Sequence, residues 1–139
     1  MLGADTLVTV DGAILGKPRD AAQAAEYVCR LAGRVHEVVG GIALVRDGAV
    51  VAEAVEVTAV RFRFLDAAEV AAYVRLGEWR GRAGGYAIQG RGAALARRIE
   101  GDYLNVVGLP LARLVDLLAE VAPQRNLQRI FDSGAPLGS

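Results

Sequence analysis

The sequence predicts a mixed α/β fold in which helices flank a sheet. Two observations carry this expectation. Strand-like runs rich in β-branched residues alternate along the chain with segments whose apolar residues recur at helical spacing. The chain has 139 residues, of which 53% are hydrophobic, so it is about one domain long and can bury a core.

The first part of the chain contains a strand, a turn and a helix. Residues 7–10 form an apolar run that ends at Asp11-Gly12, which indicates a buried strand entering a turn, and residues 13–15 continue extended behind it. Asp20 is a suitable N-cap for a segment whose apolar positions keep a helical period as far as Gly33. We therefore expect an amphipathic helix between these two residues.

A long hairpin is predicted after this helix. Residues 36–45 and 50–64 are rich in β-branched residues, and they flank the turn residues Arg46-Asp47-Gly48. The two segments are expected to be antiparallel neighbours in the sheet.

Two further helices are indicated by their ends. Asp66 followed by Glu69 is a variant of the capping box, and it predicts a helix that stops at Gly77. Pro110 opens a second helix, which runs through Val121 with its leucines on one face.

The helical period is lost after this point. Residues 123–139 contain two prolines and two glycines, which is typical of a frayed chain end. We therefore expect one domain over residues 1–122 and a flexible C-terminal tail over residues 123–139.

The segment 77–90 is the candidate binding loop. It is dense in glycine, which lets backbone N–H groups turn toward an anion and lets a ligand approach closely. Arg80 and Arg82 carry forked guanidinium groups that suit phosphate oxygens, and Gln89 is the lone amide of the segment. The alternative is a surface loop with scattered charges.

Composition limits the classes of function. Lys+Arg and Asp+Glu both number 16, so no overall positive field favours nucleic acid or a membrane as a partner. The lone Cys29 excludes an intramolecular disulfide, and the lone His36 excludes a multi-histidine metal site, while a hard metal held by carboxylates stays open. The sequence has neither a secretory signal nor an apolar run of transmembrane length, so we expect a cytoplasmic protein.

Several short segments occur in the same order as in one known family. Each is weak evidence alone, but the ordered set is specific. On these motifs the chain resembles the Maf-like proteins, also called septum-formation inhibitors, from Met1 to about Val121. The segments are Asp5-Thr6, Gly16-Lys17-Pro18, Thr58–Phe62, Gly84–Gly90 and Ile99–Pro110.

The resemblance implies an activity, a fold and partners. Maf-like proteins are nucleoside triphosphate pyrophosphatases, which cut between the α and β phosphates and release a nucleoside monophosphate and pyrophosphate. The implied fold is a mixed, elongated sheet flanked by helices, related to the inosine triphosphate pyrophosphatase architecture. A homodimer, a divalent cation (Mg²⁺ or Mn²⁺) and a role in restraining cell division are implied as well. The run Ala87–Gly90 favours the dTTP/UTP branch of the family over the 7-methyl-GTP branch.

The resemblance also assigns roles to single residues. Asp5 matches the family's catalytic carboxylate, which could deprotonate the attacking water or hold the metal. Considered without the family, Asp5 is better explained as a turn or strand-end aspartate bonded to backbone. Thr6 and Gln89 match positions tied to substrate choice, and an amide can read a base edge because it both donates and accepts.

The cations of the expected phosphate site are also assigned by resemblance. Lys17 matches the family's phosphate-site lysine, although an ordinary turn lysine is the alternative. Arg82 stands where many members have the lysine of an Asp-Lys pair, so the charge is kept while the neighbouring carboxylate is absent. Glu78 is a weakly supported second carboxylate, and His36 matches a family histidine although a lone imidazole is more often structural.

The chain departs from the family pattern at its start. Family members carry a strand, a Ser/Arg-rich phosphate-binding loop and an acidic residue ahead of the Asp-Thr motif, whereas this chain begins four residues before that motif. We therefore expect an N-terminally truncated form in which fewer cations reach the triphosphate and turnover is low. The alternative function is a catalytically impaired module that dimerises or binds a partner linked to cell division.

Overall fold

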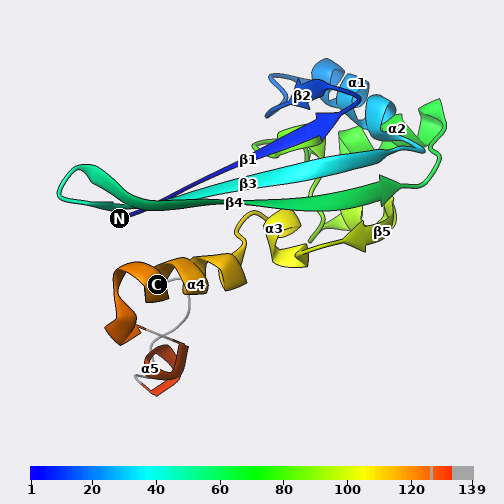
Figure 1. The fold of residues 1–139 in the computed structure, drawn as a ribbon. Coiled ribbons are helices and arrows are strands. Elements are labelled where there is room, and N and C mark those ends of the chain that lie inside the picture. The colour runs from blue at the N-terminus through cyan, green and yellow to red at the C-terminus, as the bar shows by residue number, and fades with distance from the viewer. Residues whose placement is uncertain (126, 133–139) are drawn as a thin grey trace.

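A computed structural model describes residues 1–125 and 127–132 of the protein, and its main feature is a long five-stranded sheet (Figure 1). The strand order is β2-β1-β3-β4-β5, and each of these neighbouring pairs is antiparallel. Helices flank the sheet, so the predicted α/β class is confirmed. The strands are β1 (Leu2–Val10), β2 (Ala13–Leu15), β3 (Val35–Arg46), β4 (Ala49–Phe62) and β5 (Ala96–Glu100). The helices are α1 (Ala21–Leu31), α2 (Ala67–Arg75), α3 (Tyr103–Val107), α4 (Leu111–Val121) and α5 (Leu127–Asp132), with 3-10 turns η1 (Ala83–Gly85), η2 (Arg91–Ala94) and η3 (Pro123–Arg125).

Two Asp-Gly turns set the register of the sheet. Asp11-Gly12 joins β1 to β2, and Asp47-Gly48 joins β3 to β4. The φ angles are 48° and 79° in the first turn and 53° and 77° in the second, as a type I′ turn requires at its two central positions. The resulting register places Val38 beside Val8 on one side and Thr58 on the other. The predicted hairpin over β3 and β4 is confirmed.

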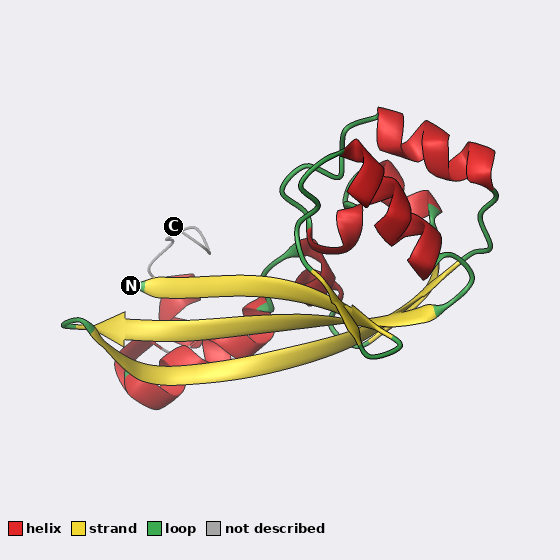
Figure 2. Ribbon diagram, turned by 90° about the horizontal axis from the view of Figure 1, so that it is seen from above, coloured by secondary structure: helices red, strands yellow, loops and turns green. Residues whose placement is uncertain are grey.

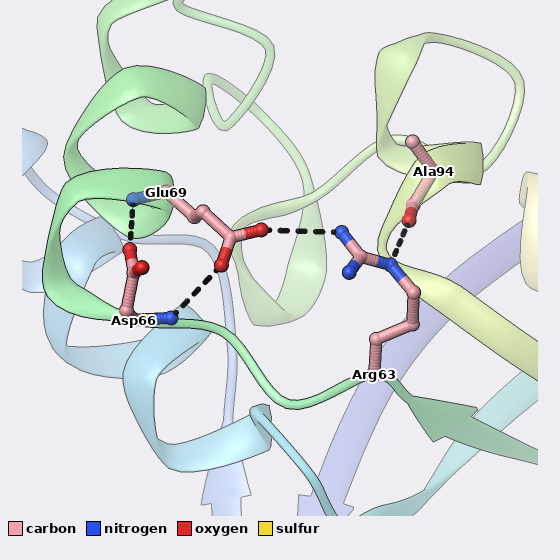
Figure 3. Close-up of polar contacts among 4 residues, drawn as sticks. All are labelled: Arg63, Asp66, Glu69 and Ala94. Atoms are coloured by element: carbon pink, nitrogen blue, oxygen red, sulfur yellow. Dashed lines mark hydrogen bonds and ion pairs between the residues drawn. The ribbon is translucent and has the colours of Figure 1, made fainter.

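A capping box begins α2 and also ties it to a distant segment (Figure 3). The Glu69 N–H donates to Asp66 Oδ1 at 2.8 Å, and the Asp66 N–H donates to Glu69 Oε1 at 3.2 Å. Arg63 Nη2 lies 3.4 Å from Glu69 Oε2, while Arg63 Nε donates to the Ala94 carbonyl at 2.8 Å. The helix start predicted from Asp66 and Glu69 is therefore confirmed, and Arg63 links it to η2.

Two apolar clusters hold the helices against the sheet. In Figure 1, α1 and α2 lie above the sheet at the end near β5, and they enclose the larger cluster. α4 lies below the other half of the strands, where Leu114 and Leu117 pack with Ile42 and Leu44. Figure 2 shows the long strands running between these two groups of helices. The buried members of the larger cluster include Val8, Val28, Val38, Val60, Phe62, Tyr73 and Tyr86.

Several elements differ from the sequence prediction. β1 begins at Leu2 and not at residue 7, and β5 and α3 were not predicted. Helical turns also occur in the expected tail, at η3 and α5, while residues 126 and 133–139 lie outside the described residues, so the flexibility expected there stays a prediction. Among the described helices, none has both the length and the apolar character needed to cross a membrane.

Candidate functional site

A pocket of about 180 Å³ opens beside the exposed half of β1. Its walls come from five segments: β1, Lys17, β3, residues 81–86 around η1, and the end of α3. Four of the five predicted site residues, Asp5, Thr6, Lys17 and Arg82, line it together. The other lining residues are Ala4, Val8, Val38, Gly81, Ala83, Tyr86, Val106, Val107 and Gly108.

Asp5 lies at the rim of the pocket. It is exposed, and its Oδ1 accepts the backbone N–H of Thr6 at 2.9 Å. This bond fixes one oxygen of the carboxylate against the backbone, although Asp5 lies within β1 and not at the strand end that the sequence predicted. Within the described residues no hydrogen bond or ion pair engages Oδ2, so that oxygen is available to a ligand.

The two cations of the pocket are unpaired within the described residues. Lys17 and Arg82 are both exposed, and neither forms an ion pair with a described carboxylate, whereas Arg34 and Arg63 do. Two unneutralised cations in one concave site favour an anionic ligand. Arg80, the other cation of the loop, instead lies 5.0 Å from the Trp79 ring centroid and does not line the pocket.

The glycine-rich loop closes on β1 because residue 84 has no side chain. Gly84 has a φ of 75°, and a Cβ there would lie 2.9 Å from Val8 Cγ2. Its N–H donates to the Gly16 carbonyl at 3.1 Å, which ties the loop to the residue before Lys17. The glycine content therefore brings Arg82 and Lys17 to the same pocket.

The pocket reaches the core at Tyr86. The Tyr86 hydroxyl and His36 Nε2 are 2.6 Å apart, and His36 is 1% exposed. Burial lowers the pKa of His36 to about 4, so the imidazole is neutral near pH 7. Both rings pack edge-on against Phe62. His36 is thus a buried core residue, in line with the structural role considered for it from the sequence. Its hydrogen-bond partner, Tyr86, also lines the pocket.

The wall formed by α3 is fixed by a buried amide that sequence reasoning missed. Asn105 is fully buried, and its Nδ2 lies 3.1 Å from the Val38 carbonyl, the Glu56 carbonyl and Thr58 Oγ1. A Cβ on Gly40 would overlap Asn105 Oδ1, so the amide fits only against a glycine. The motif Ile99–Pro110 was the available signal, although its contacts with β3 and β4 cannot be read from one sequence.

Two residues considered earlier lie elsewhere. Gln89 is exposed in the turn at residues 88–90 and is not among the residues that line this pocket, so its expected role in substrate choice stays a prediction. Glu78 is structural: its carboxylate accepts the Tyr73 hydroxyl at 2.9 Å and the Arg91 and Gly92 N–H groups at 2.9 and 3.1 Å. Burial raises the pKa of Glu78, but these hydrogen bonds outweigh it and the net pKa is lowered.

A metal ion would depend on the ligand for most of its oxygens. The described residues contain no group of three or more His, Cys, Asp or Glu side chains that could hold a metal. Mg²⁺ is commonly bound by one or two carboxylates together with substrate phosphates, so the single carboxylate of Asp5 fits that mode.

The chain is similar to known proteins over most of its length. The model of the family described as Maf-like protein matches residues 1–121. A dTTP/UTP pyrophosphatase of Symbiobacterium thermophilum is 53% identical over 121 residues, covering 86% of this chain and 61% of the relative. A dTTP/UTP pyrophosphatase of Pyrococcus furiosus is 45% identical over 131 residues, covering 94% and 67%. A nucleoside triphosphate pyrophosphatase of Xylella fastidiosa is 46% identical over 119 residues, covering 86% and 63%. The chain thus spans about three fifths to two thirds of the length of these curated relatives.

Proposed function

Because the chain belongs to the Maf-like family, we propose that it is a nucleoside triphosphate pyrophosphatase. The observation that carries the proposal is the pocket in which Asp5, Lys17 and Arg82 come together from three separate segments. The printed names of the similar proteins, dTTP/UTP pyrophosphatase and nucleoside triphosphate pyrophosphatase, support the choice of substrate class.

The pocket is suited to the phosphate end of the substrate. At about 180 Å³ it is smaller than the roughly 300–1,000 Å³ typical of sites that enclose a whole small molecule. Lys17 and Arg82 would bind phosphate oxygens, with Arg82 offering two parallel N–H donors. The nucleoside would then extend beyond the pocket, which leaves room for Gln89 to contact the base without lining the pocket itself.

The reaction follows from the same residues. Asp5 would accept a proton from a water molecule while the oxygen of that water attacks the α phosphorus. The bond from that phosphorus to the bridging oxygen breaks, and pyrophosphate leaves with its charge stabilised by Lys17 and Arg82. A bound Mg²⁺ or Mn²⁺, held by Asp5 and the substrate, would supply further charge neutralisation.

Substrate choice is assigned to Thr6 and Gln89. Thr6 lies in the pocket beside Asp5 and carries a hydroxyl that both donates and accepts. Gln89 lies three positions after Tyr86 in the sequence, and its amide can donate to and accept from the edge of a base. We propose dTTP and UTP as the first substrates to test.

The test is the identity of the released phosphate. The protein is incubated with Mg²⁺ and dTTP, UTP or 7-methyl-GTP, and pyrophosphate and orthophosphate are measured separately. Pyrophosphate with a matching amount of nucleoside monophosphate is expected. Orthophosphate as the first product would refute the reaction, while nucleotide binding without any turnover would favour the non-catalytic interaction module.

The assembly and location are proposals as well. We propose a homodimer, on the family resemblance alone, and a cytoplasmic location. Light scattering of the purified protein tests the first, since a monomeric mass at micromolar concentration would contradict it. Fractionation of the source cells tests the second.

A further inference from the structure

We propose that Tyr86 is a substrate-contacting residue whose hydroxyl donates to an oxygen of the nucleotide, and that His36 is the positioning residue that aims it. The proposal rests on the proposed function, because it names a further contact in the same pocket. It begins from two observations: Tyr86 lines the pocket, and its hydroxyl is 2.6 Å from His36 Nε2.

The environment of His36 Nδ1 determines which tautomer the imidazole adopts. Nδ1 is buried and has no hydrogen-bond partner among the described residues. A neutral imidazole carries one proton, so either Nδ1 or Nε2 bears it. A buried N–H without a partner is rarer in proteins than a carbonyl or lone pair left without one. The proton is therefore assigned to Nε2, and Nδ1 keeps only its lone pair.

This assignment determines the role of the tyrosine. If Nε2 carries the proton, the imidazole donates and the Tyr86 oxygen accepts. The hydroxyl hydrogen of Tyr86 is then free, and within the described residues no acceptor is bonded to it. The pocket that Tyr86 lines holds Lys17 and Arg82, which have no ion-pair partner among the described residues, and it is suited to an anion. An anionic oxygen in that pocket is the acceptor that completes the arrangement.

The surroundings of the pair keep it in this geometry. His36 is 1% exposed and Tyr86 is 5% exposed, and their ring centroids lie 5.4 Å apart. Phe62 packs edge-on against both, with its centroid 4.9 Å from that of His36 and 4.7 Å from that of Tyr86. Because Phe62 packs against both rings, the geometry of the pair is set before a ligand arrives.

The experiment has one arm without ligand and one with it. His36 is the only histidine in the sequence, so its imidazole nitrogen signals in a ¹⁵N NMR spectrum need no assignment. The Nε2–H tautomer is expected in the unmodified protein. The Nδ1–H tautomer would overturn the inference, whatever the protein binds.

The second arm measures affinity for Mg²⁺-dTTP and for inorganic tripolyphosphate. Tyr86→Phe keeps the ring and its packing but removes the hydroxyl, and it should weaken binding roughly 10- to 100-fold, as expected for a hydrogen bond to a charged group. Tyr103→Phe, on an exposed tyrosine of α3, is the matched control and should bind like the unmodified protein. A loss seen with both ligands places the contact on the phosphates, and a loss seen only with dTTP places it on the nucleoside.

The outcomes separate this inference from the function on which it rests. Unchanged affinity in Tyr86→Phe overturns the inference and leaves the proposed function standing. Failure of the unmodified protein to bind either ligand overturns the proposed function, and the substrate contact with it, while the tautomer still reports whether His36 donates to Tyr86.

Discussion

Asp5 is the one carboxylate among the described residues that line the pocket, and this sets what substitution there should do. Its Oδ1 is held by the Thr6 N–H, which an amide oxygen could also accept. Asp5→Asn should therefore preserve the local backbone while removing the proposed base and proposed metal ligand.

We predict that Asp5→Asn lowers kcat for pyrophosphate release by roughly 10²- to 10⁴-fold, with a smaller change in nucleotide affinity. Steady-state kinetics with coupled detection of pyrophosphate provide the measurement. Asp47→Asn, at the turn between β3 and β4, is the control because asparagine tolerates the positive φ of that position. A kcat within twofold of the unmodified protein would remove Asp5 from the chemistry.

His36 predicts a pH dependence of stability. Its pKa is about 4 in the folded protein because burial disfavours the charged form, against 6.5 in the unfolded chain. The unfolded state therefore binds the proton first, so the stability is fully present above about pH 6.5 and is lost as the pH falls toward 4. The difference corresponds to about 3 kcal/mol in the free energy of unfolding.

Urea unfolding between pH 4 and 7 measures this loss. His36→Gln serves as the comparison, since glutamine has no titrating group, and the difference between the two pH curves isolates the histidine from Glu78 and other carboxylates. Parallel curves over this range would show that His36 does not titrate as its burial requires.

Single residues also show how far the site is predictable from the sequence. Asp5, Thr6, Lys17 and Arg82 were found because short motifs carry them, and the structure brings all four to one pocket. The pairing of Tyr86 with His36 was not found, since it joins positions 50 apart in the chain through a contact that leaves no local pattern.

At the scale of elements, predictability follows the strength of local signals. The capped helices α1 and α2 and the hairpin of β3 and β4 were predicted, because Asp20, Asp66 and the Asp-Gly turn act on their nearest neighbours. α3 has five residues, too few to show a helical period, and β5 is a short, mostly exposed segment with two arginines. Both are held by contacts with β4, which sequence patterns do not reveal.

The packing of α3 on the sheet leads to a prediction for two adjacent glycines of β3. A Cβ on Gly40 would overlap Asn105 Oδ1, whereas a Cβ on Gly41 would meet nothing within 4 Å. Gly40→Ala should lower the free energy of unfolding by roughly 1–3 kcal/mol, as overpacking does. Gly41→Ala should be neutral or slightly stabilising, because it reduces the freedom of the unfolded chain.

Urea denaturation of the two variants side by side is the measurement. The pair is matched in strand, substitution and sequence neighbourhood, so a difference reports the space at each position. Equal stabilities would contradict the tight fit of Asn105 against the sheet.

At the scale of the whole molecule, one sheet contributes side chains to two separate apolar clusters. β3 contributes Val38 to the cluster under α1 and α2, and Ile42 to the cluster over α4. The pocket includes Val38 and the end of α3, and α3 lies between the two groups of helices in Figure 1. Its apolar walls therefore depend on the larger cluster, to which Val8, Val38 and Tyr86 belong and against which Val106 and Val107 pack.

The charge of the pocket predicts its dependence on metal. Lys17 and Arg82 supply two positive charges, fewer than a nucleoside triphosphate carries in negative charge, and Asp5 adds a negative one. Pyrophosphate release should therefore stop in excess EDTA and return when Mg²⁺ or Mn²⁺ is added back. Nucleotide consumption followed by chromatography provides the readout, and full activity in EDTA would exclude a metal role for Asp5.

The fit between Gly40 and Asn105 has a consequence for how the sequence can change over generations. A side chain at position 40 would collide with the amide of Asn105, and a smaller residue at position 105 would remove the donor that three oxygen acceptors share. Each single substitution passes through a less stable intermediate. Lineages should therefore either retain both residues or replace them together, so that two positions far apart in the chain are inherited as a pair.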